Sequence, residues 1–274
     1  MSFELAMPTA KVTLRSPGSG KAKARALRLA ASPGAHQRLR FDLDLRYGGP
    51  EGDVTSPTVE FDLDVVTTEV DATTGAKLEA TIVGAALLDA AASEPVVAED
   101  RDELARILGA TLRWTVDPAG QWSAVQVDVP AGTSVTRNLF ETIRVALGPT
   151  LVLPAEPVRV GATWEVEVID ELAGYGVIAT TRLAPTATGK VTSASGAVTL
   201  GAGPTEDPSP PTIGGAGSAS WALAEGQAIA TGVVETSTAM AFAATPLTEA
   251  AQIALTMRRA IAPAPEPAAA APSP

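Results

Sequence analysis

The stretch RLRFDLDLRY, residues 38–47, decides the fold class because its apolar and charged residues alternate with a period of two. A related stretch, TVEFDLDVV, follows at residues 58–66. Alternation of this kind predicts β-strands with one face in a core and the other in water. Four acids of the repeated Phe-Asp-Leu-Asp should then face solvent and pair with arginines of a neighbouring strand: Asp42, Asp44, Asp62 and Asp64. Their alternative role, a calcium or magnesium site, needs several carboxylates converging on one point.

The same alternation continues through most of the chain, with turn residues between the repeats. The stretch AKLEATIVGAALL, residues 76–88, predicts a strand whose inward face includes Ile82 and Gly84. In the strand before it, the consecutive Val65 and Val66 shift the phase, which indicates a β-bulge. Antiparallel strands joined by turns are the expected architecture.

The clearest hairpin is predicted for ATLRWTVDPAGQWSAVQVDVP, residues 110–130, with its turn at Asp117–Gly120. On the return strand, Ser123 and Val125 should share a face with Val127 and Val129. Trp122 should lie on the opposite face of that strand.

Two segments predict short helices. Residues 93–109 place acids in an expected first turn ahead of Leu104, Ile107 and Leu108, and Gly109 would end that helix. Residues 133–149 predict a second helix with an apolar stripe that contains Leu139 and Ile143. Phe140 lies off this stripe, so we expect it to reach a second surface.

The second half of the chain predicts further strands with weaker patterns. The segment GPTEDPSPPTIGGAGS, residues 203–218, is rich in Pro and Gly and predicts a loop or linker. Residues 246–261 fit either a helix or a strand. The predicted organisation is a basic, partly extended arm at residues 1–23, one β-rich domain at 24–261 and a disordered Pro/Ala tail at 262–274.

Composition excludes several classes of function. The 274-residue chain has 0 Cys and 1 His, so disulfides, thiolate zinc sites and multi-histidine metal sites are excluded. The formal charge of −11 disfavours nucleic acid as a partner. No phosphate-binding or dinucleotide-binding glycine motif occurs, and the single His36 follows a predicted turn. We expect no metal, no cofactor and no enzymatic activity; the enzymatic alternative is a hydrolase with paired carboxylates.

The sequence also bears on location. It has neither a membrane-spanning run of about 20 apolar residues nor a recognisable signal peptide. The protein is cytoplasmic if Met1 is the native start, and it belongs to the cell envelope if a signal segment was removed.

One stretch, LPAEPVRVGATWEVEV at residues 153–168, resembles the signature of an uncharacterised bacterial family. The motif has the form L-P-x-x-P-V-x-V-G-x-x-W, and the family consists mostly of exported proteins, often lipoproteins. The resemblance implies a curved antiparallel sheet partly wrapped round a helix, similar in outline to the half-barrels of lipoprotein carriers. It implies no activity and no catalytic residue.

These observations favour a mainly β, half-barrel protein that binds an apolar small molecule or lipid in its cleft. The alternative is a structural or protein-interaction module without a small-molecule ligand. Abundant alanine on the strands would leave an apolar cavity in the cleft, although alanine abundance also fits general composition. The residues predicted to line the cleft are the large aromatics of the strands: Phe41, Phe61, Trp114, Trp164 and Trp221.

Overall fold

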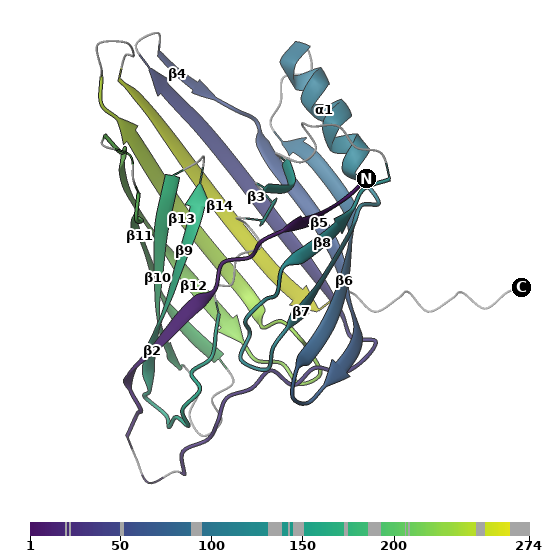
Figure 1. The fold of residues 1–274 in the computed structure, drawn as a ribbon, viewed down its shortest axis with the longest axis vertical. Coiled ribbons are helices and arrows are strands. Elements are labelled where there is room, and N and C mark those ends of the chain that lie inside the picture. The colour runs from purple at the N-terminus through teal and green to yellow at the C-terminus, as the bar shows by residue number, and fades with distance from the viewer. Residues whose placement is uncertain are drawn as a thin grey trace, which may run out of the picture.

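Fourteen strands form one antiparallel sheet in the computed structural model (Figure 1). The mainly β fold predicted from the sequence is therefore confirmed. The structure describes residues 1–19, 21, 23–49, 52–88, 95–130, 139–141, 143–144, 151–172, 175–185, 193–205, 207, 209–244 and 250–263. The elements in chain order are β1 (Ser2–Leu5), β2 (Ala10–Ser16), β3 (His36–Gly49), β4 (Gly52–Thr55), β5 (Thr58–Asp71), β6 (Gly75–Leu88), α1 (Pro95–Ile107), β7 (Thr111–Val116), β8 (Val125–Asp128), β9 (Thr163–Leu172), β10 (Tyr175–Pro185), β11 (Ser193–Ala202), β12 (Thr212–Ala222), β13 (Thr231–Phe242) and β14 (Ala251–Pro263).

The order of the strands shows how the chain is wound. Hydrogen-bonded neighbours follow the order β1-β8-β7-β6-β5-β3-β14-β13-β12-β11-β10-β9-β2, and β4 pairs with β3 beside this path. The two edge strands, β1 and β2, are thus consecutive in the chain although they lie at opposite edges of the sheet. Only four residues separate Leu5 from Ala10. Since an extended chain spans at most about 3.6 Å per residue, these two edges approach to within about 18 Å.

The segment between the two edge strands is fixed by one side chain. Gln121 accepts a hydrogen bond from the Ala10 amide at 2.8 Å and donates one to the Pro8 carbonyl at 3.1 Å. The predicted basic arm therefore contributes both edge strands. It holds the sheet in a half-barrel shape.

A short helical segment lies inside the curved sheet. Residues 139–141 and 143–144 are helical, and Phe140 and Ile143 are fully buried. The Phe140 ring contacts Phe3 of β1 edge-on, with centroids 5.7 Å apart. The second surface predicted for Phe140 is thus the edge strand β1, inside the protein. The remaining residues of the predicted helix 133–149 lie outside the described part.

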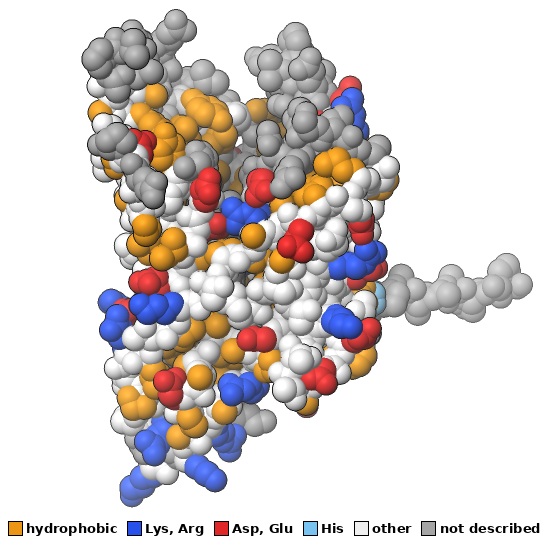
Figure 2. All heavy atoms as spheres, viewed as in Figure 1, with side chains coloured by type: hydrophobic (Ala, Val, Ile, Leu, Met, Phe, Trp, Pro, Cys, Tyr) orange, Lys and Arg blue, Asp and Glu red, His pale blue; other side chains and the backbone are white. Residues whose placement is uncertain are grey.

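One end of the half-barrel, called the closed end, is crossed by residues 24–35. Main-chain hydrogen bonds join this strap to three other segments: Arg25 to Val158, Leu29 to Pro118, and Ser32 to Gly226. The strap and the residue before it carry exposed Lys23, Arg25 and Arg28. Basic side chains accordingly gather at the lower end of the face shown in Figure 2. The opposite end of the sheet, where β10 and β12 begin, is called the far end.

Glycine residues explain why one segment predicted as a linker is a strand. Residues 212–218, predicted as a linker, form the first part of β12. A Cβ atom on Gly215 would lie 2.3 Å from the Ser237 carbonyl oxygen, and one on Gly217 would lie 2.1 Å from that of Glu235. The close approach of β13 therefore requires glycine here, as at other strongly bent positions of sheets.

Two predictions about strand phase are also wrong. The inward alternation of β5 continues through Val65 to Thr67, and the register shifts instead on either side of this stretch, between Asp62 and Leu63 and between Thr67 and Glu69. The first shift leaves Val83 of β6 unpaired and turns Gly84 outward, where its Cα faces the Asp62 side chain. A bulge thus reverses the face of every β6 residue beyond it.

The hairpin after β7 departs from simple alternation too. Trp122 stacks on Trp114, with ring centroids 5.0 Å apart. It is buried in the core and therefore lies on the face that was predicted for Val125 and Val127, not on the opposite one. Ser123 is exposed and exchanges hydrogen bonds with the Thr115 main chain through its amide and its hydroxyl. These contacts interrupt the strand between Trp122 and β8.

The remaining elements refine the predicted boundaries. Helix α1 begins at Pro95, so its acids follow the first turn, and Leu108 is 43% exposed instead of buried. The ambiguous segment 246–261 contains strand β14, which extends to Pro263. The rest of the predicted tail, residues 264–274, lies outside the described part. Among the described residues, no helix is long and apolar enough to cross a membrane.

Candidate functional site

The aromatic residues predicted to line the cleft are all buried in the main core. Phe41 and Phe61 are Cα partners across β3 and β5, and their ring centroids lie 5.7 Å apart. Both rings are 0% exposed. Trp114 is 4% exposed and is covered by Trp122.

Trp164 anchors the segment that carries the family-like motif. Its indole nitrogen donates a hydrogen bond to the Val152 carbonyl at 3.1 Å, and its ring is fully buried. Leu153 is held by an amide hydrogen bond of 2.7 Å to the Ala119 carbonyl. Gly161 has a φ of +78°, which favours glycine at the turn into β9. These contacts give the motif residues a structural role.

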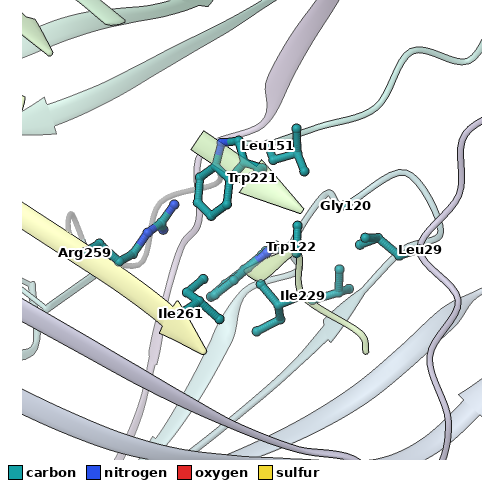
Figure 3. Close-up of a pocket in the computed structure, with 10 residues that line it drawn as sticks. Leu29, Gly120, Trp122, Leu151, Trp221, Ile229, Arg259 and Ile261 are labelled. Carbon is teal, nitrogen blue, oxygen red and sulfur yellow. The ribbon is translucent and has the colours of Figure 1, made fainter. Parts of the chain in front are cut away.

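Trp221 is the predicted residue that borders a described cavity (Figure 3). The guanidinium of Arg259 lies 5.3 Å from the centroid of its ring, within the range of a cation–π contact. Burial lowers the pKa of Arg259 to about 10, so the side chain remains a cation at neutral pH. The cavity, also bordered by Trp122 and Ile229, has a volume of about 20 Å³. That volume admits about one water molecule.

The part of the closed end around these aromatic residues is therefore a filled core among the described residues. Of the five predicted residues, Trp221 alone borders the small cavity of Figure 3, which has no room for a ligand larger than water. Contact between these five residues and a ligand stays a prediction.

A second apolar cluster, called the far-end cluster, lies apart from the main core on the same inward face. Its buried members are Val177, Ile213 and Met240, which come from β10, β12 and β13. Its partly buried members are Tyr175, Leu200, Phe242 and Ile253. Tyr175 and Phe242 meet edge-to-face, with ring centroids 5.4 Å apart.

The strand register explains why these residues meet. Ile213 is the Cα partner of Met240, Met240 of Ile253, and Ile253 of Tyr47. Cross-strand partners lie on the same face of a sheet. One row of apolar side chains therefore crosses four neighbouring strands at the far end.

On β12 and β13, small and hydroxyl-bearing residues separate this row from the main core, whereas on β14 the partly buried Leu255 packs against that core. Thr236 and Thr238 face inward on β13 and are 8% and 5% exposed. Gly217 is the partner of Thr236, and Gly215 is the partner of Thr238. These four residues fill less volume than the aromatic side chains of the closed end.

Sequence reasoning missed the far-end cluster. Its members are spread over five strands, and Ile213 lies in the segment predicted as a linker. Ile253 lies in the segment that fitted helix or strand equally well. The alternation of Thr236, Thr238, Met240 and Phe242 was a usable signal, but it carries no information about which strands are neighbours.

Two larger hollows lie elsewhere. One, of about 350 Å³, lies at the closed end between Arg28, Asp71 and Asp117. The other, of about 530 Å³, lies on the outer face over β12, β13, β14 and β3. In this outer hollow Arg258 pairs with Asp42 and Glu235, and Asp44 accepts a hydrogen bond from Thr58. The polar side chains of the outer hollow thus largely bind one another.

The acids of the repeated Phe-Asp-Leu-Asp lie on the outer face, as predicted. Arg40 donates two hydrogen bonds to Asp62, at 3.1 and 3.0 Å, and lies 3.4 Å from Glu60. His36 is exposed, and its Nδ1 atom is 3.9 Å from Asp64. The predicted Arg–Asp pairing across β3 and β5 is confirmed. In the described part of the chain, no three His, Cys, Asp or Glu side chains gather as a metal site.

Comparison with known proteins gives no functional assignment. No protein-family model matches the chain, and no curated protein sequence matches it significantly. The resemblance of residues 153–168 to an uncharacterised bacterial family stays a prediction.

Proposed function

We propose that the protein is a non-catalytic binding protein that holds an apolar small molecule or lipid against the far-end cluster. The observation that supports this is a second cluster of buried apolar residues on the inward face of the sheet, which has its own buried members and shares the partly buried Leu200 with the main core. Small-molecule sites are mostly apolar surfaces with a few polar groups, set in a rigid concave scaffold.

In this proposal the two parts of the inward face have different roles. The aromatic core at the closed end fixes the curvature of the sheet, and the far-end cluster provides the contact surface. Thr236 and Thr238 lie between them with hydroxyls that make no hydrogen bond within the described part of the chain. They supply the polar groups that orient a ligand.

Mass spectrometry of the organic extract of natively purified protein tests the proposal. We expect one apolar compound in near-stoichiometric amount. If it is lost during purification, the neutral fluorescent probe N-phenyl-1-naphthylamine should bind with a stoichiometry of one. An empty extract together with no probe binding by folded protein would contradict the proposal.

A matched pair of variants locates the site. Ile253→Ala removes an inward apolar side chain of the far-end cluster, and Ile169→Ala removes one that is 49% exposed on β9. We expect the first to weaken probe binding about tenfold, from the apolar area lost, and the second to leave it unchanged. Equal effects of the two changes would contradict the assignment.

One observation favours the alternative, a protein-interaction module. Val83 and Leu108 are 46% and 43% exposed, and main-chain hydrogen bonds join their neighbours, since Gly109 donates to the Ile82 carbonyl at 2.9 Å. These two apolar side chains therefore lie near each other on the surface. A stable protein complex that dissociates on Val83→Asp, combined with an empty extract, would support this alternative.

A further inference from the structure

A buried arginine adjoins the far-end cluster. Arg144 ends the described part of the helical segment inside the sheet, and its side chain is 10% exposed. It donates from Nε to Glu141 at 3.0 Å, from Nη1 to Asp170 at 2.6 Å, and from Nη2 to the Glu171 carbonyl at 3.3 Å. The side chains of Glu141, Arg144 and Asp170 are called the Arg144 triad below.

The strand register places this triad beside the apolar row. Asp170 of β9 is the Cα partner of Val177 of β10, so the two residues lie on the same face of the sheet. Val177 is a buried member of the far-end cluster. The triad therefore forms a charged border of the proposed ligand site.

The charge of the triad is negative. Burial acts to lower the pKa of Arg144, but the hydrogen bond and charge of Asp170, followed by those of Glu141, outweigh it and raise the pKa. Arg144 is thus a cation held between two carboxylates. The sum of the three charges is −1.

The two carboxylates of the triad keep free acceptor oxygens. The three hydrogen bonds that Arg144 donates, one from each guanidinium nitrogen, use three of its five N–H groups. On the carboxylates, Arg144 binds Glu141 Oε2 and Asp170 Oδ1, and the Glu171 amide donates to the same Asp170 Oδ1 at 2.8 Å. Glu141 Oε1 and Asp170 Oδ2 accept no hydrogen bond from the residues that the structure describes.

We propose that the ligand is an amphiphile with an alkyl chain and a primary ammonium head group, which binds Glu141 Oε1 and Asp170 Oδ2. This inference rests on the proposed function, since it assigns the head group of the molecule held by the far-end cluster. An ammonium provides three donors and one positive charge, which complement two acceptor oxygens and a net negative border. A carboxylate head group would be repelled by both acids.

Three ligands with the same twelve-carbon chain test the inference: dodecylammonium, dodecanol and laurate. Each is titrated against N-phenyl-1-naphthylamine bound to the full chain, the two ions below their critical micelle concentrations and dodecanol below its solubility limit. We expect dodecylammonium to displace the probe at a concentration at least about tenfold lower than laurate, with dodecanol between them, as charge-assisted hydrogen bonds at a partly buried site imply.

Two outcomes overturn the inference, and they separate it from the proposed function. If dodecanol displaces the probe but laurate binds as tightly as dodecylammonium, the head-group assignment is wrong and the apolar site stands. If none of the three ligands binds and the probe itself does not bind, the proposed function fails, and this inference fails with it.

A matched pair of variants identifies the carboxylate. Glu141→Gln removes one charge and keeps an acceptor for Arg144, at a side chain that is already 44% exposed. Glu171→Gln makes the same change at an exposed neighbour of Asp170, whose own side chain is outside the triad. We expect the preference for dodecylammonium over laurate to fall about fivefold or more in Glu141→Gln and to stay unchanged in Glu171→Gln. Equal losses in both variants would show a general charge effect and overturn the assignment.

Discussion

At the closed end of β12, Trp221 lies against Arg259 in the main core, whereas at the start of the same strand Ile213 belongs to a separate apolar cluster. The two residues are eight positions apart, which corresponds to about 27 Å along a strand. The closed end is filled by stacked aromatic rings and crossed by the strap. The far end carries aliphatic side chains and one aromatic pair, bordered by threonines, glycines and the partly buried Arg144 triad.

This difference indicates that buried side chains on the inward face have two different roles in the protein. Side chains of the closed end are buried against one another across many strands, so they stabilise the fold. Side chains of the far end form a cluster with three buried members. Substitutions at the two ends should therefore separate stability from ligand binding, and the following predictions are ordered by the size of the expected effect.

The largest effect is expected for Phe41→Ala at the closed end. Phe41 is fully buried against Phe61, and replacing a core phenylalanine by alanine costs about 3–5 kcal/mol of unfolding free energy. Urea denaturation followed by circular dichroism measures this loss. A loss below about 1 kcal/mol would show that the aromatic cluster is not the stabilising core.

A smaller, pH-dependent effect is expected for Glu165→Gln. Glu165 of β9 accepts hydrogen bonds from Arg15 of the edge strand β2 at 2.6 Å and from Arg182 of β10 at 2.9 Å. The hydrogen bonds from Arg15 and then Arg182 lower the pKa of Glu165 below its usual 4.5, although burial acts in the opposite direction. The carboxylate therefore stabilises the fold above the pKa of the unfolded chain.

This stabilisation should disappear as the pH falls through the lowered pKa of the folded state. Wild type should thus be more stable than Glu165→Gln at pH 7, and the difference should shrink progressively below about pH 4.5. Glu167→Gln is the control, because Glu167 is 40% exposed and lies 3.7 Å from Lys11 alone among the described residues. Denaturation curves at several pH values that show a constant difference would contradict the role of Glu165.

A still smaller loss of stability is expected for Ile253→Ala at the far end. Ile253 is only partly buried, so we expect a cost of about 1 kcal/mol, well below that of a fully buried side chain. Its main effect should be on probe binding, as proposed above. If Ile253→Ala destabilised the protein as much as Phe41→Ala, the far-end cluster would be part of one continuous core.

The smallest effect is expected for Arg40→Gln on the outer face. The Arg40 side chain is 48% exposed. Its hydrogen bonds to Asp62 join β3 to β5 on the outer, solvent-facing side of the sheet. The guanidinium pKa of Arg40 is raised first by the hydrogen bond to Asp62 and then by its charge. Exposed pairs of this kind contribute about 0–1 kcal/mol, so the urea midpoint should shift only slightly, and less in high salt.

The strongly alternating segments made much of the fold predictable. In residues 38–47 and 58–66, every second residue is apolar, and a one-residue slip would expose Phe41 and Phe61 together. The outward acids and their arginine partners followed from the same alternation. Turn residues marked the hairpins, although the bulge at Val83 reversed the predicted face of Gly84.

The closure of the half-barrel was not predictable from such local patterns. Strand β1 pairs Ser2 with Asp128, a separation of 126 residues, and only four residues lie between its last residue, Leu5, and the strand at the opposite edge of the sheet. Nothing in the local alternation of these strands specifies distant neighbours. The far-end cluster escaped prediction for the same reason, and because Gly215 and Gly217 gave β12 the composition of a linker.

The most direct test of the account compares quenching of tryptophan fluorescence by a brominated twelve-carbon amine in wild type and in Phe242→Trp. The four native tryptophans belong to the main core, and Phe242 belongs to the far-end cluster. Since bromine quenches at near contact, the account predicts strong quenching of the emission added by Phe242→Trp and little quenching of the wild type. Saturable quenching of the native tryptophans with no extra quenching in Phe242→Trp would contradict it and place the ligand among the aromatic residues of the closed end.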